Sequence, residues 1–176
     1  MKVNLWCGRK LFKDYVNVDC VQWEWVDKVV DLDNYPWDFE DNSIDEIYAD
    51  NIIEHLDYAK STKEIYRILK VWWTILIKVP YFSNPWAFFA DHKCFFNFDS
   101  YNKYCSNMNP WADLSEPYFE LVERKIIFID DIYKWLIYKI IYFIPKLIYK
   151  FFPRAYIWFL SYTFPASELH FKLKKI

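Results

Sequence analysis

Short apolar runs that alternate with polar stretches are the main feature of the first half of the chain. Runs of this length, rich in Val and Ile and stopped by a polar residue or a proline, are typical of β-strands. Five strands are predicted, at residues 3–5, 15–19, 28–32, 43–49 and 74–79. Strands separated by helices or compact turns indicate an α/β fold with a mostly parallel central sheet, flanked by helices and wound in a Rossmann-like way. In such sheets the ligand binds beyond the carboxyl ends of the strands.

One helix is predicted between the last two of these strands. It is expected to start within residues 51–56, and residues 61–70 continue the helical period through Ile65, Ile68 and Leu69.

The pattern changes in the second half of the chain. Residues 81–117 are rich in Phe, Asn, Asp, Pro and Trp without a steady period, so we expect a lid or insertion there. Residues 119–129 return to a strand pattern. Residues 131–162 are predicted to be helical, with interruptions near Pro145 and Pro153.

The remaining pattern completes a single domain. Residues 170–174 alternate between apolar and polar side chains and predict a last strand. A length of 176 residues suits one domain over residues 1–176. Its parts are a first half at residues 1–80, the lid or insertion at 81–117, and C-terminal strands and amphipathic helices at 118–176.

The composition contains one Gly and ten Trp, whereas an average chain has about 7% Gly. Several Trp occupy positions where a turn after a strand or helix normally needs Gly, notably Trp6, Trp72, Trp73 and Trp86. One reading is that a codon such as UGA, read as Gly in the source, has been translated as Trp. The abundance of Ile, Lys, Asn, Tyr and Phe fits the AT-rich coding sequence in which that codon is frequent. The other reading is that these are ordinary core aromatics.

Charge and cysteine usage exclude several classes of protein. A net charge of −2 and a pI near 5.9 give no general attraction to nucleic acid. The cysteines form no CxxC pair and no zinc-type spacing with a histidine, so no metal site is expected. We expect the cysteines to be free thiols in a reducing, cytoplasmic compartment. The chain enters a strand almost at once, without a secretory signal, and contains no uncharged apolar run of about 20 residues. The residues concerned are Cys7, Cys20, Cys94, Cys105, His55, His92 and His170.

An ordered set of motifs resembles one enzyme family. The segments are VNLWCG, YVNVD, VVDL, FEDNSIDEIYADNIIEHL and KEIYRILKVWWTILIKVP, within residues 3–80. They resemble those of compact, type-11-like class I S-adenosylmethionine-dependent methyltransferases, whose forms of the first and last are LNLGCG and REIYRVLKPGGILIIxVP. The later segments DHKCFFNFDSY, FFPRAY and FPASELHF resemble the end of such enzymes. The resemblance implies that S-adenosylmethionine is the cofactor and that residues 1–80 form the half that binds it.

The resemblance also implies roles for individual residues. The first loop would pass the methionine part of the cofactor, an acid would accept hydrogen bonds from the ribose hydroxyls, a turn would flank the adenine, and a fourth position would face the sulfonium. Leu5, Trp6, Cys7 and Gly8 form that first loop, and Asp19 is the acid. Asp31 and Leu32 form the turn beside the adenine, and Asp50 and Asn51 would face the sulfonium. Simpler readings remain open for three of them, namely a solvated strand end at Asp19, a plain turn at Asp31 and a helix N-cap at Asp50 and Asn51.

Histidines are the candidates for contact with the methyl acceptor. His92 lies in the segment expected to form a lid, where it is a candidate substrate contact or catalytic base; otherwise it is a loop residue. His55, in the EHL segment, resembles a structural helix motif of the family more than a base. Methyl transfer depends largely on holding the nucleophile and the methyl carbon in line, so a strong base is not required.

Departures from the family pattern bear on activity. An indole at Trp6 would lie where the cofactor passes, the pair at Trp72 and Trp73 would strain a turn, and Val71 replaces the usual Pro. Genuine Trp would favour a methyltransferase-like module that has lost its cofactor and serves as an interaction or membrane-surface domain. Gly at these positions would favour an active enzyme.

The acceptor is only partly restricted by the sequence. Asp50-Asn51-Ile52-Ile53 stands where amine-modifying DNA and RNA methyltransferases carry a Pro-Pro motif, which argues against a nucleic-acid substrate. Small molecules, sugars and lipid-linked compounds remain. Residues 132–164 interleave apolar and aromatic side chains with Lys and Arg, so they either lie at a membrane interface as a peripheral contact or cap the active site against the sheet. The oligomeric state is left open.

Overall fold

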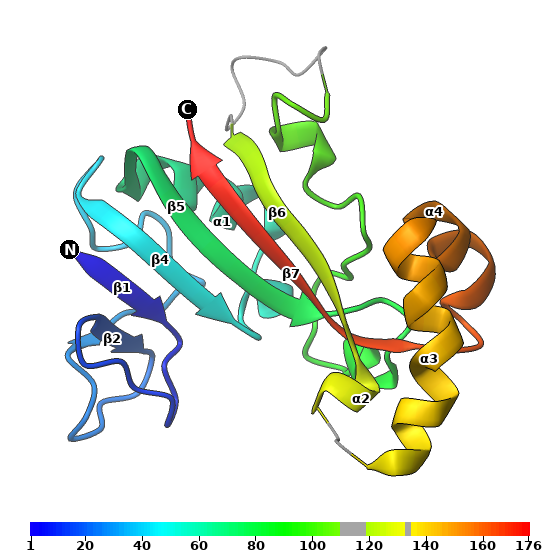
Figure 1. Cartoon of the computed structure of the whole chain (residues 1–176). Coiled ribbons are helices and arrows are strands. Elements are labelled where there is room, and N and C mark those ends of the chain that lie inside the picture. The colour runs from blue at the N-terminus through cyan, green and yellow to red at the C-terminus, as the bar shows by residue number, and fades with distance from the viewer. Residues whose placement is uncertain (110–118, 133–134) are drawn as a thin grey trace.

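The computed structural model describes residues 1–109, 119–132 and 135–176 (Figure 1). Strands in this part of the chain form one seven-stranded sheet, in the order β3-β2-β1-β4-β5-β7-β6. The strands are β1 Lys2–Leu5, β2 Val16–Asp19, β3 Lys28–Val29, β4 Ile44–Asp50, β5 Leu69–Pro80, β6 Phe119–Phe128 and β7 Ala166–Lys175. All five N-terminal strands, the strand at 119–129 and the final strand are therefore confirmed, although β3 is shorter than predicted.

The sheet is parallel except around one strand. β1 to β5 pair in parallel, whereas β7 runs antiparallel to both β5 and β6. The chain moves outward from β1 through β2 to β3, then returns to place β4 on the other side of β1. That reversal creates a topological switch point at the carboxyl ends of β1 and β4, where sheets of this kind bind ligands.

Helix α1 follows the predicted helix only in part. It spans Tyr58–Ile68 and is preceded by a single 3₁₀ turn, η1, at Ile53–His55. The Asp57 carboxylate caps α1 by accepting a hydrogen bond from the backbone N–H of Lys60 at 2.9 Å. Ile65 and Ile68 face the sheet and are buried. The helix expected to start within residues 51–56 is thus a short turn, because the cap at Asp57 sets the true beginning.

Flanking helices are missing from much of the first half, which corrects the expected architecture. The connections at residues 6–15, 20–27 and 30–43 contain no helix. A crossover that includes a helix needs at least 10–12 residues, and these segments are too short or too rich in turn-forming Asp, Asn and Pro. Among the described residues, helix α1 lies behind the sheet and no helix lies in front of it (Figure 1).

The two faces of the sheet differ accordingly. Alternate side chains of β4, β5 and β7 on the α1 face are apolar and fully buried, including Ile47, Ile75, Ile77, Leu169 and Phe171. The opposite face carries charged pairs between neighbouring strands. Lys2 on β1 binds Glu46 on β4 at 2.8 Å, and Lys174 on β7 binds Glu120 on β6. Side chains alternate across a strand, so one face builds the core and the other faces water.

Residues 81–109, part of the segment expected to form a lid or insertion, contribute to the core beside α1. Tyr81, Phe96, Tyr101 and Tyr104 are almost completely buried there, and Tyr81 forms a bridge with Phe96. The segment contains two 3₁₀ turns, η2 at Pro85–Phe88 and η3 at Asn102–Tyr104. It therefore supplies apolar cover as well as one wall of the candidate site. Residues 110–117 of the expected lid lie outside the described residues.

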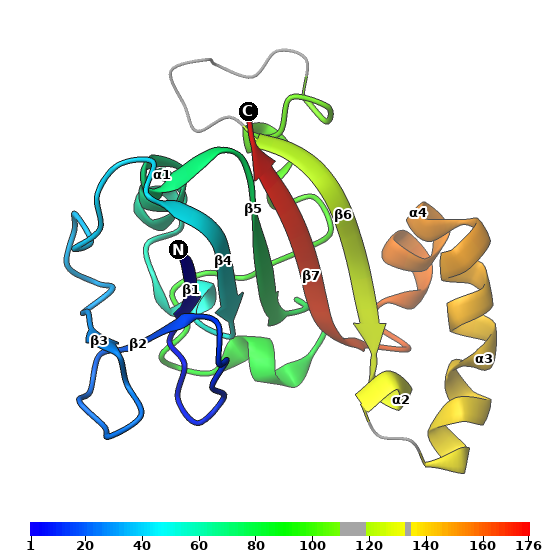
Figure 2. The ribbon, with the colours of Figure 1, turned by 60° about the vertical axis from the view of Figure 1, so that its left-hand side comes forward.

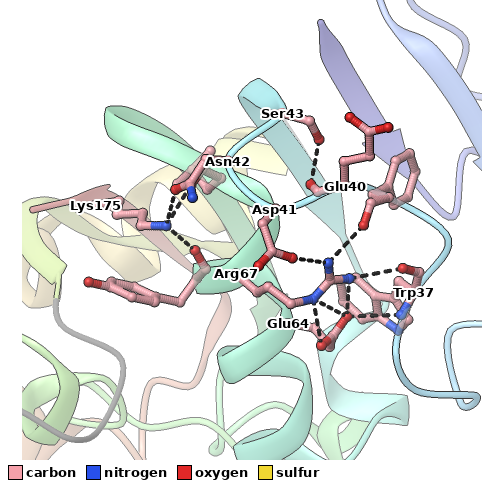
Figure 3. Close-up of polar contacts among 11 residues, drawn as sticks. Trp37, Glu40, Asp41, Asn42, Ser43, Glu64, Arg67 and Lys175 are labelled. Carbon is pink, nitrogen blue, oxygen red and sulfur yellow. Dashed lines mark hydrogen bonds and ion pairs between the residues drawn. The ribbon is translucent and has the colours of Figure 1, made fainter.

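Arg67 on α1 ties the helix-free connection between β3 and β4 to the rest of the fold (Figure 3). Its guanidinium donates to the carboxylates of Glu64 and Asp41, both at 2.7 Å, and to the carbonyl oxygens of Phe39 at 2.7 Å and Trp37 at 2.9 Å. Glu64 also accepts the backbone N–H of Trp37 at 2.9 Å. Charge-assisted bonds of this kind are the stronger ones, so they order a segment that has no helical hydrogen bonds of its own.

The helical C-terminal region stands beside the sheet past β6, as two views show (Figures 1 and 2). It comprises α2 Ile129–Ile132, α3 Leu136–Phe151, α4 Pro153–Ala155 and the π-helical turn η4 Tyr156–Leu160. The predicted break near Pro145 is wrong, since α3 runs through it, whereas α3 does end just before Pro153. The ring of Pro145 is buried, so packing compensates for the helical hydrogen bond that proline cannot donate.

Tryptophans lie mainly on the surface. Among the described Trp residues, only Trp37 is buried; the others are exposed. Trp6 and Trp72 also have positive φ values of 58° and 72°, a region that glycine adopts freely and bulky residues avoid. Asn42 and Asn51 share that conformation, which Asn tolerates. Exposure and backbone conformation thus argue against the core-aromatic reading at two of the positions where the sequence pattern suggested Gly.

Replacing Trp72 with Gly should stabilise the protein. Trp72 is 68% exposed in an irregular stretch of β5, and a non-glycine residue in the left-handed region costs about 1–2 kcal/mol. Loss of its exposed contact with Lys174 offsets roughly 0.5 kcal/mol, and the greater backbone freedom of Gly in the unfolded chain offsets about 0.5 kcal/mol more. We expect Tm in a thermal unfolding scan to rise by about 1–2 °C.

The neighbouring residue supplies the control for this prediction. Trp73 is also exposed but has no positive φ, so Trp73→Gly gains no relief and loses about 0.5–1 kcal/mol of backbone entropy. Equal falls in Tm for Trp72→Gly and Trp73→Gly would contradict the assignment of strain to position 72.

Candidate functional site

Asp19 lies at the carboxyl end of β2, beside the loop that follows β1. Its side chain is buried, and its two carboxylate oxygens accept the backbone N–H groups of Gly8 at 3.0 Å and Val21 at 3.2 Å. A carboxylate offers about four lone-pair positions, so acceptor capacity remains for further hydroxyl groups. The simpler reading of a solvated strand end does not fit this burial.

The first loop turns sharply after β1. Leu5 and Cys7 are buried, and the Cys7 N–H donates to the carbonyl of Val18 at 2.7 Å. Burial and the charge of Asp19 raise the pKa of the Cys7 thiol, so the thiol stays protonated. Gly8, the single glycine, has φ 51°, and a Cβ built on it would meet no atom within 4 Å. Backbone conformation, rather than a lack of space, therefore explains glycine at this position.

Indoles surround this loop. Trp6 is 41% exposed at φ 58°, directly before Cys7. Trp25 donates its indole N–H to the Gly8 carbonyl at 2.8 Å and stacks on Trp23 at a centroid distance of 5.7 Å. Three aromatic side chains therefore lie at the edge where the cofactor was expected to approach the backbone.

Asp50 ends β4 and is tied to the first loop by Lys10. The Lys10 ammonium donates to the Asp50 carboxylate at 2.6 Å and to the Tyr48 hydroxyl at 2.5 Å, and Tyr48 donates to Asp50 at 2.7 Å. Burial alone would raise the pKa of Asp50, but the bonds from Lys10 and Tyr48 and the charge of Lys78 outweigh it and lower that pKa. A charged network therefore spans the switch point from β1 to β4.

Asn51 connects the expected cofactor side with a cavity. It adopts φ 52°, and its N–H donates to the carbonyl of Lys78 on β5 at 2.9 Å. Asp57, and not Asp50 or Asn51, caps α1, so the N-cap reading of the two earlier residues does not hold. The position of Asn51 at the mouth of the cavity is consistent with a binding role.

Asp31 and Leu32 form a self-contained turn. Asp31 is exposed and accepts the N–H of Asp33 at 3.0 Å and the side-chain amide of Asn34 at 2.7 Å. Leu32 is buried, and its carbonyl accepts the indole N–H of Trp37 at 2.9 Å. The plain-turn reading accounts for these contacts, and the flanking of an adenine ring stays a prediction.

A cavity of about 230 Å³ lies beyond the carboxyl ends of β4 and β5. Its walls come from η1, the 81–109 segment and the start of β7, and they combine aromatic and titratable side chains. The lining residues are Asn51, Glu54, His55, Pro80, Asn84, Trp86, Phe89, His92, Ser167 and Glu168. His92, the expected substrate contact or base, is thus in this wall, with its ring 4.6 Å from that of His55.

Glu54 is the member of the cavity wall that sequence reasoning missed. It is only 1% exposed, and neither carboxylate oxygen has a hydrogen-bond partner among the described residues. Burial raises its pKa to about 8, and the charges of Asp50, Asp91 and Glu168 act in the same direction. The available signal was a charged residue between the apolar Ile53 and His55, in a segment that we interpreted as a structural motif.

Solved structures of one enzyme class share this architecture. The chain is similar to an S-adenosylmethionine-dependent methyltransferase from Archaeoglobus fulgidus, with a TM-score of 0.61 and 16% identity over 99% of this chain and 85% of that one. It is also similar to one from Mesorhizobium loti, with a TM-score of 0.58 and 10% identity over 99% and 90% of the two chains. The chain has the class I methyltransferase fold. No protein-family model and no curated protein sequence matches it.

Solved structures with this fold are named for different activities. The cyclase SpnF is also similar to this chain, with a TM-score of 0.56 and 13% identity over 99% of this chain and 73% of that one. At such identities the likeness establishes the fold alone, so function has to be argued from the residues at the switch point.

Proposed function

We propose that this chain transfers a methyl group from S-adenosylmethionine to a small-molecule, sugar or lipid-linked acceptor. The observation that carries the proposal is the buried Asp19 carboxylate, held by Gly8 at the switch point of a class I methyltransferase fold. An acid at the end of the second strand is the group that this type of fold uses for ribose hydroxyls. Similar solved structures of S-adenosylmethionine-dependent methyltransferases support the choice of cofactor.

The remaining cofactor contacts follow from the positions of the loops. The loop Leu5, Trp6, Cys7 and Gly8 would carry the methionine part, and Asp31 and Leu32 would flank the adenine. Asp50 and Asn51 would face the sulfonium side, with the Asp50 carboxylate held by Lys10. Each role rests on its place at the carboxyl edge of the sheet.

The methyl acceptor would occupy the cavity beside Asn51. A volume of about 230 Å³ suits a small molecule or the reacting end of a larger one. Trp86 and Phe89 supply apolar walls, and His92, which also lines the cavity, would contact or deprotonate the acceptor. Since an in-line displacement is accelerated mainly by positioning, these walls would contribute more than a strong base. The net charge of −2 disfavours a nucleic-acid acceptor.

Asp19→Asn tests the cofactor site. In a chain that also carries Trp6→Gly, the substitution removes the charge and presents an amide N–H to a backbone donor. Loss of charge-assisted bonds worth roughly 1.5–3 kcal/mol should weaken S-adenosylmethionine binding by about 10–100-fold in calorimetry. Transfer of a labelled methyl group to a metabolite and lipid extract should fall in parallel.

Asp14→Asn is the matched control, because Asp14 is exposed near the opposite end of β2. It should leave both cofactor affinity and methyl transfer unchanged. Equal cofactor affinities before and after Asp19→Asn would remove the basis of the proposed function.

A cofactor-less module is the second candidate function, favoured by the indole of Trp6 at the first loop. In that case the class I methyltransferase fold would serve as an interaction or membrane-surface domain. The two candidates share one further feature, a surface on the C-terminal helices that is suited to lipid.

Helix α3 presents three distinct faces. Tyr138, Tyr142, Pro145 and Tyr149 pack toward the protein. Exposed apolar side chains occupy a second face, and η4 exposes two further aromatic rings; these residues are Leu136, Ile137, Ile140, Ile144, Leu147 and Phe151 on α3, and Trp158 and Phe159 on η4. Three cations, Lys139, Lys146 and Lys150, line a third face beside the apolar one.

This arrangement favours the membrane-interface reading of residues 132–164 over the capping-helix reading. An apolar face bordered by Lys suits a helix lying at the boundary between headgroups and acyl chains, and its positive charge complements an anionic lipid surface. No described helix is long and apolar enough to span a bilayer. We therefore propose peripheral contact of α3 and η4 with anionic membranes, which would bring a lipid-linked acceptor toward the enzyme. Residues 133 and 134 lie outside the described residues.

A further inference from the structure

Three side chains that are separated in sequence converge in the wall of the cavity. Glu54 and His55 come from η1, and His92 comes from the segment after η2. One ligand atom from each lies within 4.8 Å of one from each of the others. Two imidazoles and a carboxylate form a donor set typical of sites for divalent transition metals.

Glu54 lacks hydrogen-bond partners for its carboxyl group in the described part of the chain. Its side chain is almost fully buried, and both oxygens lack a hydrogen-bond donor in the described part of the chain. A cation at this position would supply the partner that both buried oxygens lack.

Each imidazole has its Nδ1 beside an oxygen acceptor. The Nδ1 of His92 lies 3.0 Å from the Ala87 carbonyl, which can only accept, so Nδ1 carries the proton and Nε2 keeps its lone pair. The Nδ1 of His55 lies 3.3 Å from the Asp91 carboxylate. Among the described residues, neither Nε2 has a hydrogen-bond partner. Metal-ligating histidines typically make this contact through their second nitrogen, which fixes the ring.

The backbone holds the three residues together. The Glu54 carbonyl accepts the N–H groups of Lys93 at 2.7 Å and Cys94 at 3.1 Å, which fastens the residues after His92 to η1. The Cys94 thiol donates to the Ile53 carbonyl at 3.4 Å. The donors thus sit on segments already bonded to each other, so little chain ordering is needed to bring them around one ion.

We infer that Glu54, His55 and His92 bind one divalent first-row transition-metal ion in the wall of the cavity. Metal–ligand bonds of about 2.0–2.2 Å at tetrahedral angles place ligand atoms roughly 3.4 Å apart. The three ligand atoms now lie within 4.8 Å of one another, so side-chain movements of about 1 Å would complete the site. Mg²⁺ and Ca²⁺ prefer all-oxygen sites, whereas two nitrogens favour Zn²⁺ or Co²⁺. Three protein ligands leave a coordination position for water or a substrate atom, so a metal-bound His92 would act on the acceptor through the ion and not as a base.

Binding of Co²⁺ and Zn²⁺ to the full chain, without any cofactor, tests the site. We expect one equivalent of Co²⁺ with visible d–d absorption of a nitrogen and oxygen environment, displaced by Zn²⁺. Glu54→Gln, His55→Ala and His92→Ala should each weaken Zn²⁺ binding at least about 100-fold in calorimetry, since each removes one of three ligands. Circular dichroism establishes whether each variant is folded. If an alanine variant does not fold, the isosteric Glu54→Gln still tests the site.

Three controls separate this donor set from others. His170→Gln changes the third histidine of the chain, Glu123→Gln changes an exposed acid on β6, and Cys94→Ser removes the nearest thiol. All three should retain binding. Absence of bound metal, a thiolate charge-transfer band lost in Cys94→Ser, or binding unaffected by His92→Ala would overturn the inference. The readout is metal affinity, so it is independent of whether the chain transfers methyl groups.

Discussion

Replacing Trp6 with Gly is expected to create or greatly strengthen binding of S-adenosylmethionine. The loop must hold position 6 at φ 58°, where a residue with a Cβ is disfavoured by about 1–2 kcal/mol. The indole also belongs to the loop after β1, where the methionine part of the cofactor is expected, two residues before the Gly8 N–H that donates to Asp19. Because the free chain already holds φ 58°, the conformational relief that Gly brings stabilises the fold and is the same in the free and bound states, so the gain in cofactor affinity comes from removal of the indole. Calorimetry with S-adenosylmethionine measures the change.

Trp6→Ala separates the two contributions. Alanine removes the indole but keeps a Cβ in the left-handed region. It should therefore recover cofactor affinity but not the gain in folding stability. Trp135→Gly controls for the loss of an exposed indole, because Trp135 precedes α3, away from the switch point. Equal cofactor affinity before and after Trp6→Gly would exclude an obstructing indole, and only if neither version binds the cofactor would the result favour the cofactor-less module.

The chemical identity of residue 6 in the source organism decides between the two candidate functions. Trp6 and Trp72 share a positive φ, and both are exposed. Trp37, by contrast, is buried and donates its indole N–H to the Leu32 carbonyl, as a genuine core tryptophan does. Mass spectrometry of the protein isolated from its source should therefore find Trp at position 37. Gly at positions 6 and 72 would support the codon reading.

The sheet could be predicted from the sequence because its signals are local. The apolar residues of β1, β2 and β4 are consecutive or alternate, and Asp19 and Asp50 follow two of these strands directly. Parallel strands bring their carboxyl ends to one edge, so the position of the candidate cofactor site followed from strand order alone. The prediction of helices flanking the first strands was wrong. No local signal distinguishes a compact turn from a helical crossover in segments as short as residues 20–27.

The cluster of Glu54, His55 and His92 could not be predicted in the same way. No spacing rule joins Glu54 to His92, and their proximity depends on hydrogen bonds between the backbones of η1 and residues 93–94. Lys10 is similar, because its contact with Asp50 crosses from the first loop to β4. Contacts made by tertiary folding, rather than by periodicity, account for what the sequence did not reveal.

Introducing charge into the exposed face of α3 is expected to abolish binding to anionic membranes. Ile140 and Ile144 lie one turn apart on that face, 67% and 63% exposed. Insertion of an isoleucine side chain into the acyl boundary is worth about 1.5–3 kcal/mol. The double substitution Ile140→Glu and Ile144→Glu removes both contributions and adds repulsion from anionic headgroups. Sedimentation with vesicles containing phosphatidylserine should show a loss of affinity of at least about 100-fold.

Two comparisons identify what occupies this face. Val122→Glu places the same charge on an exposed apolar position of β6 and should leave vesicle binding unchanged. Because Lys139 and Lys150 would pair with anionic headgroups, raising the salt concentration should weaken binding, whereas vesicles of neutral lipid should bind poorly. Dimers that dissociate on the same double substitution, in a protein that does not sediment with vesicles, would instead assign the face to a second copy of the chain. A monomer that sediments only with anionic vesicles is the result that the Lys-bordered face of α3 predicts.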